Sequence, residues 1–295
     1  MKVLDGKAIA SAIRNELHAR CVELTEQGLR VPKMAVVLVG DNPASLLYVQ
    51  HKLDACHSVG LEAECIHLSA SSTEEELLRE VDRLNQDETV DGFLVQLPLP
   101  KHISEGRVME RINWRKDVDG LTAENIGRAV LGKPAIESAT PRGIRELMSR
   151  YGITTEGKHI VVIERDVEDG EASLLLPNVV DKPLASLMLL NSLEKNATVS
   201  LCHAGSENIK DICLSADILI VAASRPGMIK GDMVREGAVV IDVGMTRIDG
   251  QMHGDVDWES VAPKCSYISP VPGGVGPMTV AALLMNLMET NDREL

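Results

Sequence analysis

Residues 34–52 read MAVVLVGDNPASLLYVQHK, and this stretch decides the fold of the first half of the chain. It opens with a continuous apolar run, residues 34–39, of the length expected for a buried strand. A turn follows, in which Asn42 is a residue type that caps helices and Pro43 suits the first helical position. The stretch therefore predicts a strand, a turn and a helix in immediate succession.

The alternation of strand and helix continues along the chain. Apolar runs of strand length lie at residues 62–68, 92–96, 159–163, 197–202, 218–222 and 238–243. Helical patterns mark residues 8–27, 45–59, 140–151, 182–193, 207–214 and 278–289, and a Ser-x-x-Glu capping box at Ser72 opens another helix. Strands that alternate with helices form parallel sheets with right-handed crossovers. The sequence therefore predicts an α/β fold with ligands beyond the carboxyl ends of the strands.

Two α/β domains are expected. The helix at residues 140–151 would lead into the second domain, and the final helix, apolar on most faces, would pack back onto the first. The predicted division is residues 1–139 plus 278–295 for a first, parallel-sheet domain, and residues 140–277 for a second, Rossmann-like domain.

Composition excludes several classes of function. The 295 residues carry a formal net charge of -14 and only 2% aromatic residues, which argues against nucleic-acid binding by attraction or by base stacking. The six cysteines form no C-x-x-C pair, so neither a disulfide framework nor a metal site is expected. No signal peptide or membrane span stands out. We expect a cytoplasmic protein with reduced thiols, no metal and no membrane partner.

Two stretches carry side chains suited to chemistry. Ser45, Tyr48 and Lys52 fall at i, i+3 and i+7 of the predicted helix, so a hydroxyl, a phenol and an ammonium group share one face. Gln96 ends a predicted buried strand and precedes the rigid segment Leu97-Pro98-Leu99-Pro100. A solvated surface stripe is the alternative interpretation of the helix face.

Two loops complete the pattern. The segment at 115–121 is dense in charge, contains Asp119 and closes with a glycine, although an exposed turn would look the same. The segment at 270–277, PVPGGVGP, is a glycine-rich turn. Gly273 and Gly274 would let backbone approach a ligand closely, and a plain turn is again the alternative.

With these motifs in this order, the chain resembles the bifunctional methylenetetrahydrofolate dehydrogenase/methenyltetrahydrofolate cyclohydrolase family over nearly its whole length. The resemblance implies a cleft between two domains, with folate bound against the first and a nicotinamide dinucleotide, NADP or NAD, against the second. It also implies a homodimer, which no residue pattern here establishes.

The resemblance also assigns roles to individual residues. It makes Lys52 the central catalytic group of water addition, held by Gln96, while Tyr48 packs on the aminobenzoyl ring and Asp119 anchors the pterin. Paired hydrogen bonds from the pterin's amino and ring NH groups suit a carboxylate. The remaining folate contacts are expected from Ser45, Leu97, Pro98, Pro272, Gly273 and Gly274.

The chain departs from the family pattern at the loop that receives the dinucleotide. After the strand at 159–163 it reads Glu164-Arg165-Asp166, where the family has Gly-Arg-Ser, and residues 167–177 are an insertion. A carboxylate about 4 Å from a phosphate costs roughly 4 kcal/mol at an effective dielectric near 20. We therefore expect retained cyclohydrolase activity and impaired or altered dehydrogenase activity.

Alternatives to this expectation remain. In one, the insertion loops outward and a fully bifunctional enzyme binds NADP, with His203, Ala204, Gly244 and Met245 compatible with either outcome. A non-catalytic folate-binding paralogue is a second alternative. Short-chain dehydrogenases also use Tyr-x-x-x-Lys, but they need a glycine-rich turn near the N-terminus, where Gly6 stands alone.

Overall fold

The computed structural model describes residues 1–164 and 196–292, and this part of the chain forms two compact units. The first unit contains residues 11–139 and 280–292, and the second contains residues 1–10, 140–164 and 196–279. The divisions fall inside helix α1 (Gly6–Glu26), at the start of α6 (Ala139–Arg150) and inside α10 (Val275–Asp292).

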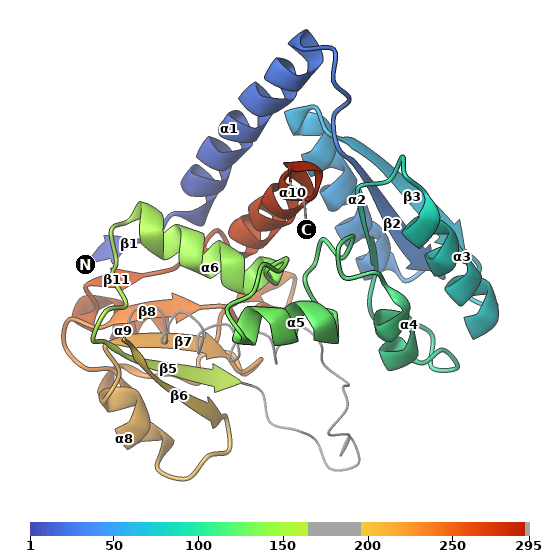
Figure 1. Ribbon diagram of the computed structural model, residues 1–295. Helices are drawn as coiled ribbons and strands as arrows, with labels where there is room; N and C mark the ends of the chain where they lie inside the picture. The colour runs from blue at the N-terminus through green and yellow to red at the C-terminus, as the bar shows by residue number, and fades with distance from the viewer. Residues whose placement is uncertain (165–195, 293–295) are drawn as a thin grey trace. The chain divides into compact units, whose positions relative to one another are not determined.

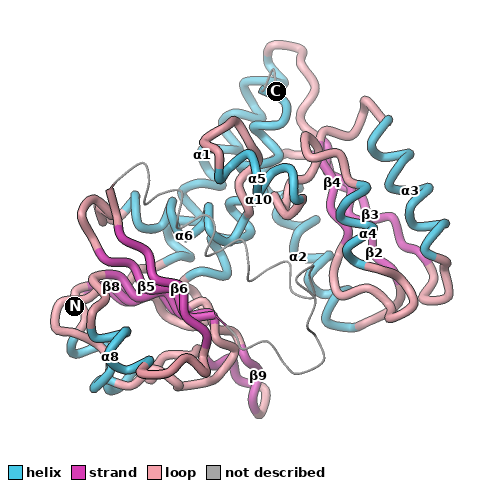
Figure 2. The backbone as a smooth tube through the Cα atoms, turned by 60° about the horizontal axis from the view of Figure 1, so that its bottom comes forward, coloured by secondary structure: helices cyan, strands magenta, loops and turns pink. Residues whose placement is uncertain are grey.

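The first unit is built on a parallel sheet of β3 (Glu62–Leu68), β2 (Lys33–Val39) and β4 (Gly92–Val95), in that order. Figure 2 shows the three strands side by side. The chain passes from β2 to β3 on one side and later to β4 on the other. The strand order therefore reverses at β2, and ligands of α/β sheets bind beyond the carboxyl ends of the strands at such a reversal.

Both faces of this sheet are covered by helices. On β2, Met34, Val36 and Leu38 pack into one cluster with residues of α1, α2 (Pro43–Val59) and α10. The alternate residues of β2 pack into a second cluster with α3 (Glu74–Gln86) and α4 (Glu105–Arg111). Successive strand side chains point to opposite faces, so burial on both sides explains why this strand is continuously apolar.

Helix α2 begins where the sequence predicts. The Asn42 carboxamide oxygen accepts hydrogen bonds from the backbone NH groups of Ala44 at 2.9 Å and Ser45 at 3.2 Å, and Pro43 occupies the first turn. These bonds satisfy NH groups that lack partners inside the helix. The helix ends at Gly60, whose φ of 89° suits a left-handed cap.

The capping box of α3 is shifted by one residue from its predicted place. Thr73, rather than Ser72, accepts a hydrogen bond from the Glu76 NH, and the Glu76 carboxylate accepts one from the Thr73 NH. The stretch Ser72-Thr73-Glu74-Glu75-Glu76 offers two registers for the same motif. Sequence spacing alone therefore leaves the register open.

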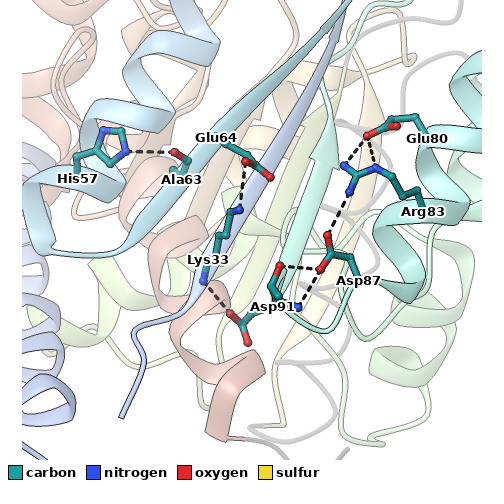
Figure 3. A network of polar contacts seen from close by, with 9 residues as sticks. Lys33, His57, Ala63, Glu64, Glu80, Arg83, Asp87 and Asp91 are labelled. Carbon is teal, nitrogen blue, oxygen red and sulfur yellow. Dashed lines mark hydrogen bonds and ion pairs between the residues drawn. The ribbon is translucent and has the colours of Figure 1, made fainter. Parts of the chain in front are cut away.

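Polar contacts join the amino ends of these strands, as Figure 3 shows. The Lys33 backbone NH donates to the Asp91 carboxylate at 2.7 Å, and its ammonium group pairs with Glu64 at 3.1 Å. Arg83 pairs with Glu80 and Asp87 nearby. Exposed ion pairs contribute at most about 1 kcal/mol each, so the apolar clusters carry the stability of the unit.

The second unit contains a parallel sheet in the order β1-β11-β8-β7-β5-β6. Its strands are β1 (Lys2–Val3), β5 (His159–Glu164), β6 (Thr198–His203), β7 (Ile218–Ala222), β8 (Val239–Asp242) and β11 (Tyr267–Ile268). An antiparallel hairpin of β9 (Thr246–Ile248) and β10 (Gln251–His253) follows β8. Since β6 and β7 flank β5, the strand order reverses at β5.

Short helices complete the described elements. They are α5 (Ala123–Val130) in the first unit, and α8 (Ile209–Leu214), α9 (Trp258–Val261) and the 3-10 turns Gly231–Met233 and Ala262–Lys264 in the second. In the described residues no helix is long and apolar enough to cross a membrane, and no group of three or more His, Cys, Asp or Glu side chains is placed to hold a metal ion.

The predicted two-domain α/β fold with parallel sheets is confirmed. The division between the units differs at the N-terminus, because β1 pairs with β11 and residues 1–10 therefore join the second unit. The helix predicted at 182–193 lies outside the described residues. All six cysteines are free thiols, and Cys65 is the exposed one.

Candidate active site

The predicted row of polar side chains on α2 is only partly exposed. Tyr48 is 48% exposed, whereas Ser45 is 4% exposed and sits against the body of the first unit. Lys52 is half-buried, one turn beyond Tyr48. The exposed phenol therefore offers a flat apolar surface beside a partly shielded amine.

Lys52 meets two side chains from distant parts of the sequence. Its Nζ donates to Gln96 Oε1 at 3.4 Å and lies 3.6 Å from Asp119 Oδ2, within ion-pair range. Gln96 follows β4, and its Nε2 donates to the Leu97 backbone carbonyl at 2.7 Å, which turns its oxygen towards the amine. The expected contact of Lys52 and Gln96 is present, and it lies beyond the carboxyl end of the sheet.

Asp119 belongs to a loop attached to the edge of the sheet. The Phe93 NH of β4 donates to the Lys116 carbonyl at 2.7 Å, and Phe93 forms a parallel bridge with Asp117. The Asp119 side chain is 22% exposed, so its carboxylate reaches the surface beside Lys52. The loop is thus an ordered segment that pairs alongside β4 at the edge of the sheet, and it is not a simple exposed turn.

The segment after Gln96 turns sharply. The Leu97-Pro98 peptide bond is cis, Leu97 is half-buried and Pro98 is exposed. The Leu99 NH donates to Glu105 Oε1 at 2.9 Å, which ties the turn to α4. Leu97 and Pro98 therefore adjoin the polar group formed by Lys52, Gln96 and Asp119.

The glycine-rich turn at 270–277 lies in the second unit. The peptide bond before Pro272 is cis, and the Gly273 carbonyl accepts a hydrogen bond from the Lys7 NH at 3.1 Å. Gly273 has a φ of 111°, and a Cβ on Gly6 would lie 1.8 Å from the Gly274 carbonyl oxygen. Backbone packing thus already requires glycine at position 6, and the positive φ favours glycine at position 273. A contact of this turn with folate stays a prediction.

Residues predicted to bind a dinucleotide gather at the carboxyl ends of strands in the second unit. Glu164 ends β5 at the reversal of strand order, and it is the register partner of His203 at the end of β6. The Ala204 NH donates to the Glu164 carbonyl at 2.9 Å, and Met245, beyond β8, is 47% exposed. This edge has the topology of a dinucleotide site. Arg165, Asp166 and the insertion at 167–177 lie outside the described residues.

Two buried carboxylates near this edge escaped the sequence analysis. Asp242, the last residue of β8, accepts hydrogen bonds from the NH groups of Gly244, Asp255 and Val256, each at 3.0 Å. Burial, with a smaller effect of the neighbouring Asp255 carboxylate, raises the pKa of Asp242 from 3.8 to about 7 despite those three donors. A Cβ on Gly254 would lie 2.0 Å from Asp242 Oδ2, so the carboxylate requires glycine at position 254. That glycine is the trace of the buried carboxylate in the sequence.

Comparisons with known proteins agree with this arrangement. The family model described as tetrahydrofolate dehydrogenase/cyclohydrolase, catalytic domain, matches residues 4–119, and the one described as the NAD(P)-binding domain of the same family matches residues 138–295. The chain is 47% identical to the bifunctional protein FolD of Porphyromonas gingivalis, over 97% of this chain and 96% of that one.

Solved structures give the same result. The bifunctional FolD of Campylobacter jejuni is 41% identical, with a TM-score of 0.91 and 100% of both chains covered. The Trypanosoma brucei FolD, solved with NADP cofactor and inhibitor, is 33% identical, with a TM-score of 0.87 and coverage of 99% of this chain and 97% of that one.

These matches correct one expectation. The sequence predicts impaired dehydrogenase activity because residues 164–166 and the insertion at 167–177 depart from the family's phosphate-binding pattern. The NAD(P)-binding model nevertheless spans this departure, and the matched relatives are bifunctional. Doubt about NADP therefore has no support, and the alternative of a retained dinucleotide site fits better.

Proposed function

The chain belongs to the tetrahydrofolate dehydrogenase/cyclohydrolase family, and we propose from this that it is a bifunctional enzyme of one-carbon metabolism. In this proposal it oxidises 5,10-methylenetetrahydrofolate with NADP and hydrolyses 5,10-methenyltetrahydrofolate to 10-formyltetrahydrofolate. The observation that carries the proposal is the position of the Lys52 amine, 3.4 Å from Gln96 and 3.6 Å from Asp119.

The hydrolytic step needs a group that moves protons at one carbon. Water adds to the cationic amidine carbon of the methenyl substrate, so a carbon–oxygen bond forms and the bound water must lose a proton. The ring nitrogen then gains a proton and its bond to that carbon breaks, while the new hydroxyl group loses its remaining proton to solvent as the carbonyl forms, which leaves the formyl group on the other nitrogen. A positioned amine such as Lys52 suits both transfers.

The neighbours of Lys52 would direct this amine and the substrate. The Gln96 oxygen accepts one of its hydrogen bonds, which limits the directions in which the remaining ammonium protons point. Asp119 carries a carboxylate suited to paired NH donors of a pterin. The exposed ring of Tyr48 can stack against the aminobenzoyl group.

The dehydrogenase step is assigned to the edge of the second unit. NADP, when bound, supplies the hydride acceptor. The reversal of strand order at β5 and the position of Glu164, His203, Ala204 and Met245 at the strand ends fit a dinucleotide. The exposed Met245 side chain and the exposed His203 would lie against it. A homodimer acting in the cytoplasm completes the proposal, and sedimentation would measure the dimer.

Replacement of Lys52 tests the hydrolytic role. We expect Lys52→Met to lower the rate of methenyltetrahydrofolate hydrolysis by about 10²- to 10⁴-fold, the usual contribution of a general acid or base. The loss of substrate absorbance measures the rate. Lys33→Met is the matched control, because Lys33 lies at the amino end of β2 and pairs with Glu64. Equal rates in wild type and Lys52→Met would remove Lys52 from catalysis, and inactivity of the wild type would favour a non-catalytic folate binder.

Calorimetric titration with NADP and NAD tests the dehydrogenase assignment. We expect micromolar binding of NADP, together with NADPH formation when methylenetetrahydrofolate is added. Hydrolysis without binding of either dinucleotide would contradict the bifunctional proposal and leave a cyclohydrolase alone.

A further inference from the structure

The backbone on both sides of Asp119 is held by hydrogen bonds. The Val118 carbonyl accepts from the Asn286 side chain at 2.7 Å, and the Asp119 carbonyl accepts from the Ala139 NH at 3.1 Å. The Gly120 NH donates to the Asp117 carbonyl at 3.1 Å and to Asp117 Oδ1 at 3.0 Å. The two peptide groups on either side of the Asp119 Cα are thus fixed, while the Asp119 carboxylate lies 3.6 Å from the Lys52 amine.

Asn286 reaches this loop from α10. Its side chain is almost fully buried, and Nδ2 donates to both the Val118 carbonyl and the Glu137 carbonyl, at 2.7 and 2.8 Å. The flanking residues Leu283, Leu284 and Leu287 lie in the apolar cluster beneath the sheet. The Asn286 carboxamide therefore joins Val118 to Glu137. The segment after Glu137 also contains Ala139, whose NH donates to the Asp119 carbonyl.

Asp117 holds the other side of the loop. It is 1% exposed, and its second oxygen accepts from the Thr122 NH at 2.7 Å and from Asn125 Nδ2 at 3.1 Å. Burial raises the pKa of this carboxyl. Burying an amide and a carboxyl costs free energy unless their partners are well placed, and replacing both by apolar groups would often leave a fold equally stable. These polar residues therefore do more than fill the core.

We propose that Asn286 is a positioning residue of the folate site, which acts by fixing the main chain of Asp119 so that its carboxylate faces Lys52 and the pterin. This inference rests on the proposed function. Asn286 does not touch the predicted reacting atoms, and its effect passes through Asp119. A displacement of about 1 Å in a binding group is enough to lower activity by about 100-fold.

The test is a double-mutant cycle on binding. Asn286→Leu keeps the approximate size of the side chain and removes the two donors, while Asp119→Asn removes the charge through which Asn286 is proposed to act. The probe is 5-formyltetrahydrofolate, a stable folate whose affinity calorimetry measures without turnover. We expect Asn286→Leu to weaken binding about 10-fold in the wild-type background and less than about twofold in the Asp119→Asn background.

A control separates positioning from general destabilisation. Leu24→Ala removes a buried side chain of α1 from the same apolar cluster and leaves the hydrogen-bond donors and acceptors of the loop in place. We expect it to lower the Tm and to leave the affinity for 5-formyltetrahydrofolate unchanged. A crystal structure of Asn286→Leu should show the Asp119 carboxylate moved out of ion-pair range of Lys52.

The outcomes are distinct. An unmoved Asp119 in the crystal, or equal losses in both backgrounds of the cycle, would overturn the positioning role while leaving the proposed function intact. Failure of the wild type both to bind 5-formyltetrahydrofolate and to hydrolyse methenyltetrahydrofolate would instead overturn the proposed function, and this inference with it.

Discussion

Asp242 shows how environment sets the charge of a single residue. Three backbone NH groups favour its ionised form, yet burial and the nearby Asp255 carboxylate raise its pKa from 3.8 to about 7. The folded protein therefore holds a proton here that the unfolded chain releases well below neutral pH. Near neutrality this proton couples stability to pH.

The free energy of unfolding should fall between about pH 4 and about pH 7 because of this residue. Since the folded pKa lies above the unfolded one, the contribution is complete below about pH 4 and is lost as the pH rises through about 7. Its size is up to about 4 kcal/mol, because each pKa unit of the shift corresponds to about 1.4 kcal/mol. In urea unfolding, Asp242→Asn should lose this part of the pH dependence, whereas Asp249→Asn in an exposed turn should keep it. A wild-type stability that rises across this range, with no change on mutating Asp242, would contradict the assignment.

Residues of the site differ in how well the sequence predicts them. Lys52 and Gln96 could be placed because helical spacing defines a face and the end of a strand defines an edge. Asn286 could not, because its two bonds join it to carbonyls 168 and 149 positions earlier. A single asparagine in an apolar helix carries no local signal of such partners.

At the scale of elements, local chemistry predicts helix starts well and short strands poorly. Asn42 and Pro43 predicted the start of α2 because caps act within one turn. Strands β1 and β11 have two residues each, too few for a period of two to appear, and they exist through their pairing with each other and with β8. The short helices α4 and α5 were missed as well.

The cap of α3 offers a direct test of register. Thr73→Ala should lower the free energy of unfolding by about 1 kcal/mol, because it leaves the Glu76 NH without its acceptor. Ser72→Ala is the matched control, since Ser72 precedes the cap, and we expect a change within about 0.5 kcal/mol. Chemical denaturation measures both. A larger loss for Ser72→Ala would restore the register expected from sequence.

At the scale of the whole molecule, each unit has its own reversal of strand order, at β2 in the first and at β5 in the second. The predicted folate residues follow β2 and β4 in the first unit and β11 in the second, and the predicted dinucleotide residues follow β5, β6 and β8. The alternation of strands and helices predicted the ligand-binding edge of the first unit, whereas the dinucleotide residues of the second unit were expected from the resemblance to a known family. The pairing of residues 1–10 with the second unit depends on contacts between distant segments, which alternation does not reveal.

The first unit should depend on α10 for its stability. Five residues of this helix, Ala282, Leu283, Leu284, Leu287 and Met288, are at most 5% exposed and cover one face of the sheet. A chain of residues 11–139 alone should therefore lack a cooperative urea transition, and the same chain linked flexibly to residues 280–292 should regain one. Circular dichroism measures both, with Leu283→Asp in the linked chain as the control. Cooperative unfolding of residues 11–139 alone would contradict this dependence.

The bond from Asn286 to the Val118 carbonyl also bears on synthesis. A ribosome makes Lys52, Gln96 and Asp119 long before it reaches position 286. The nascent polypeptide therefore contains these three residues before Asn286 can donate its hydrogen bond to the Val118 carbonyl. Under the proposed function, the folate site would therefore be complete only after translation has passed α10, and a prematurely released chain would carry Lys52 without a fixed Asp119 loop.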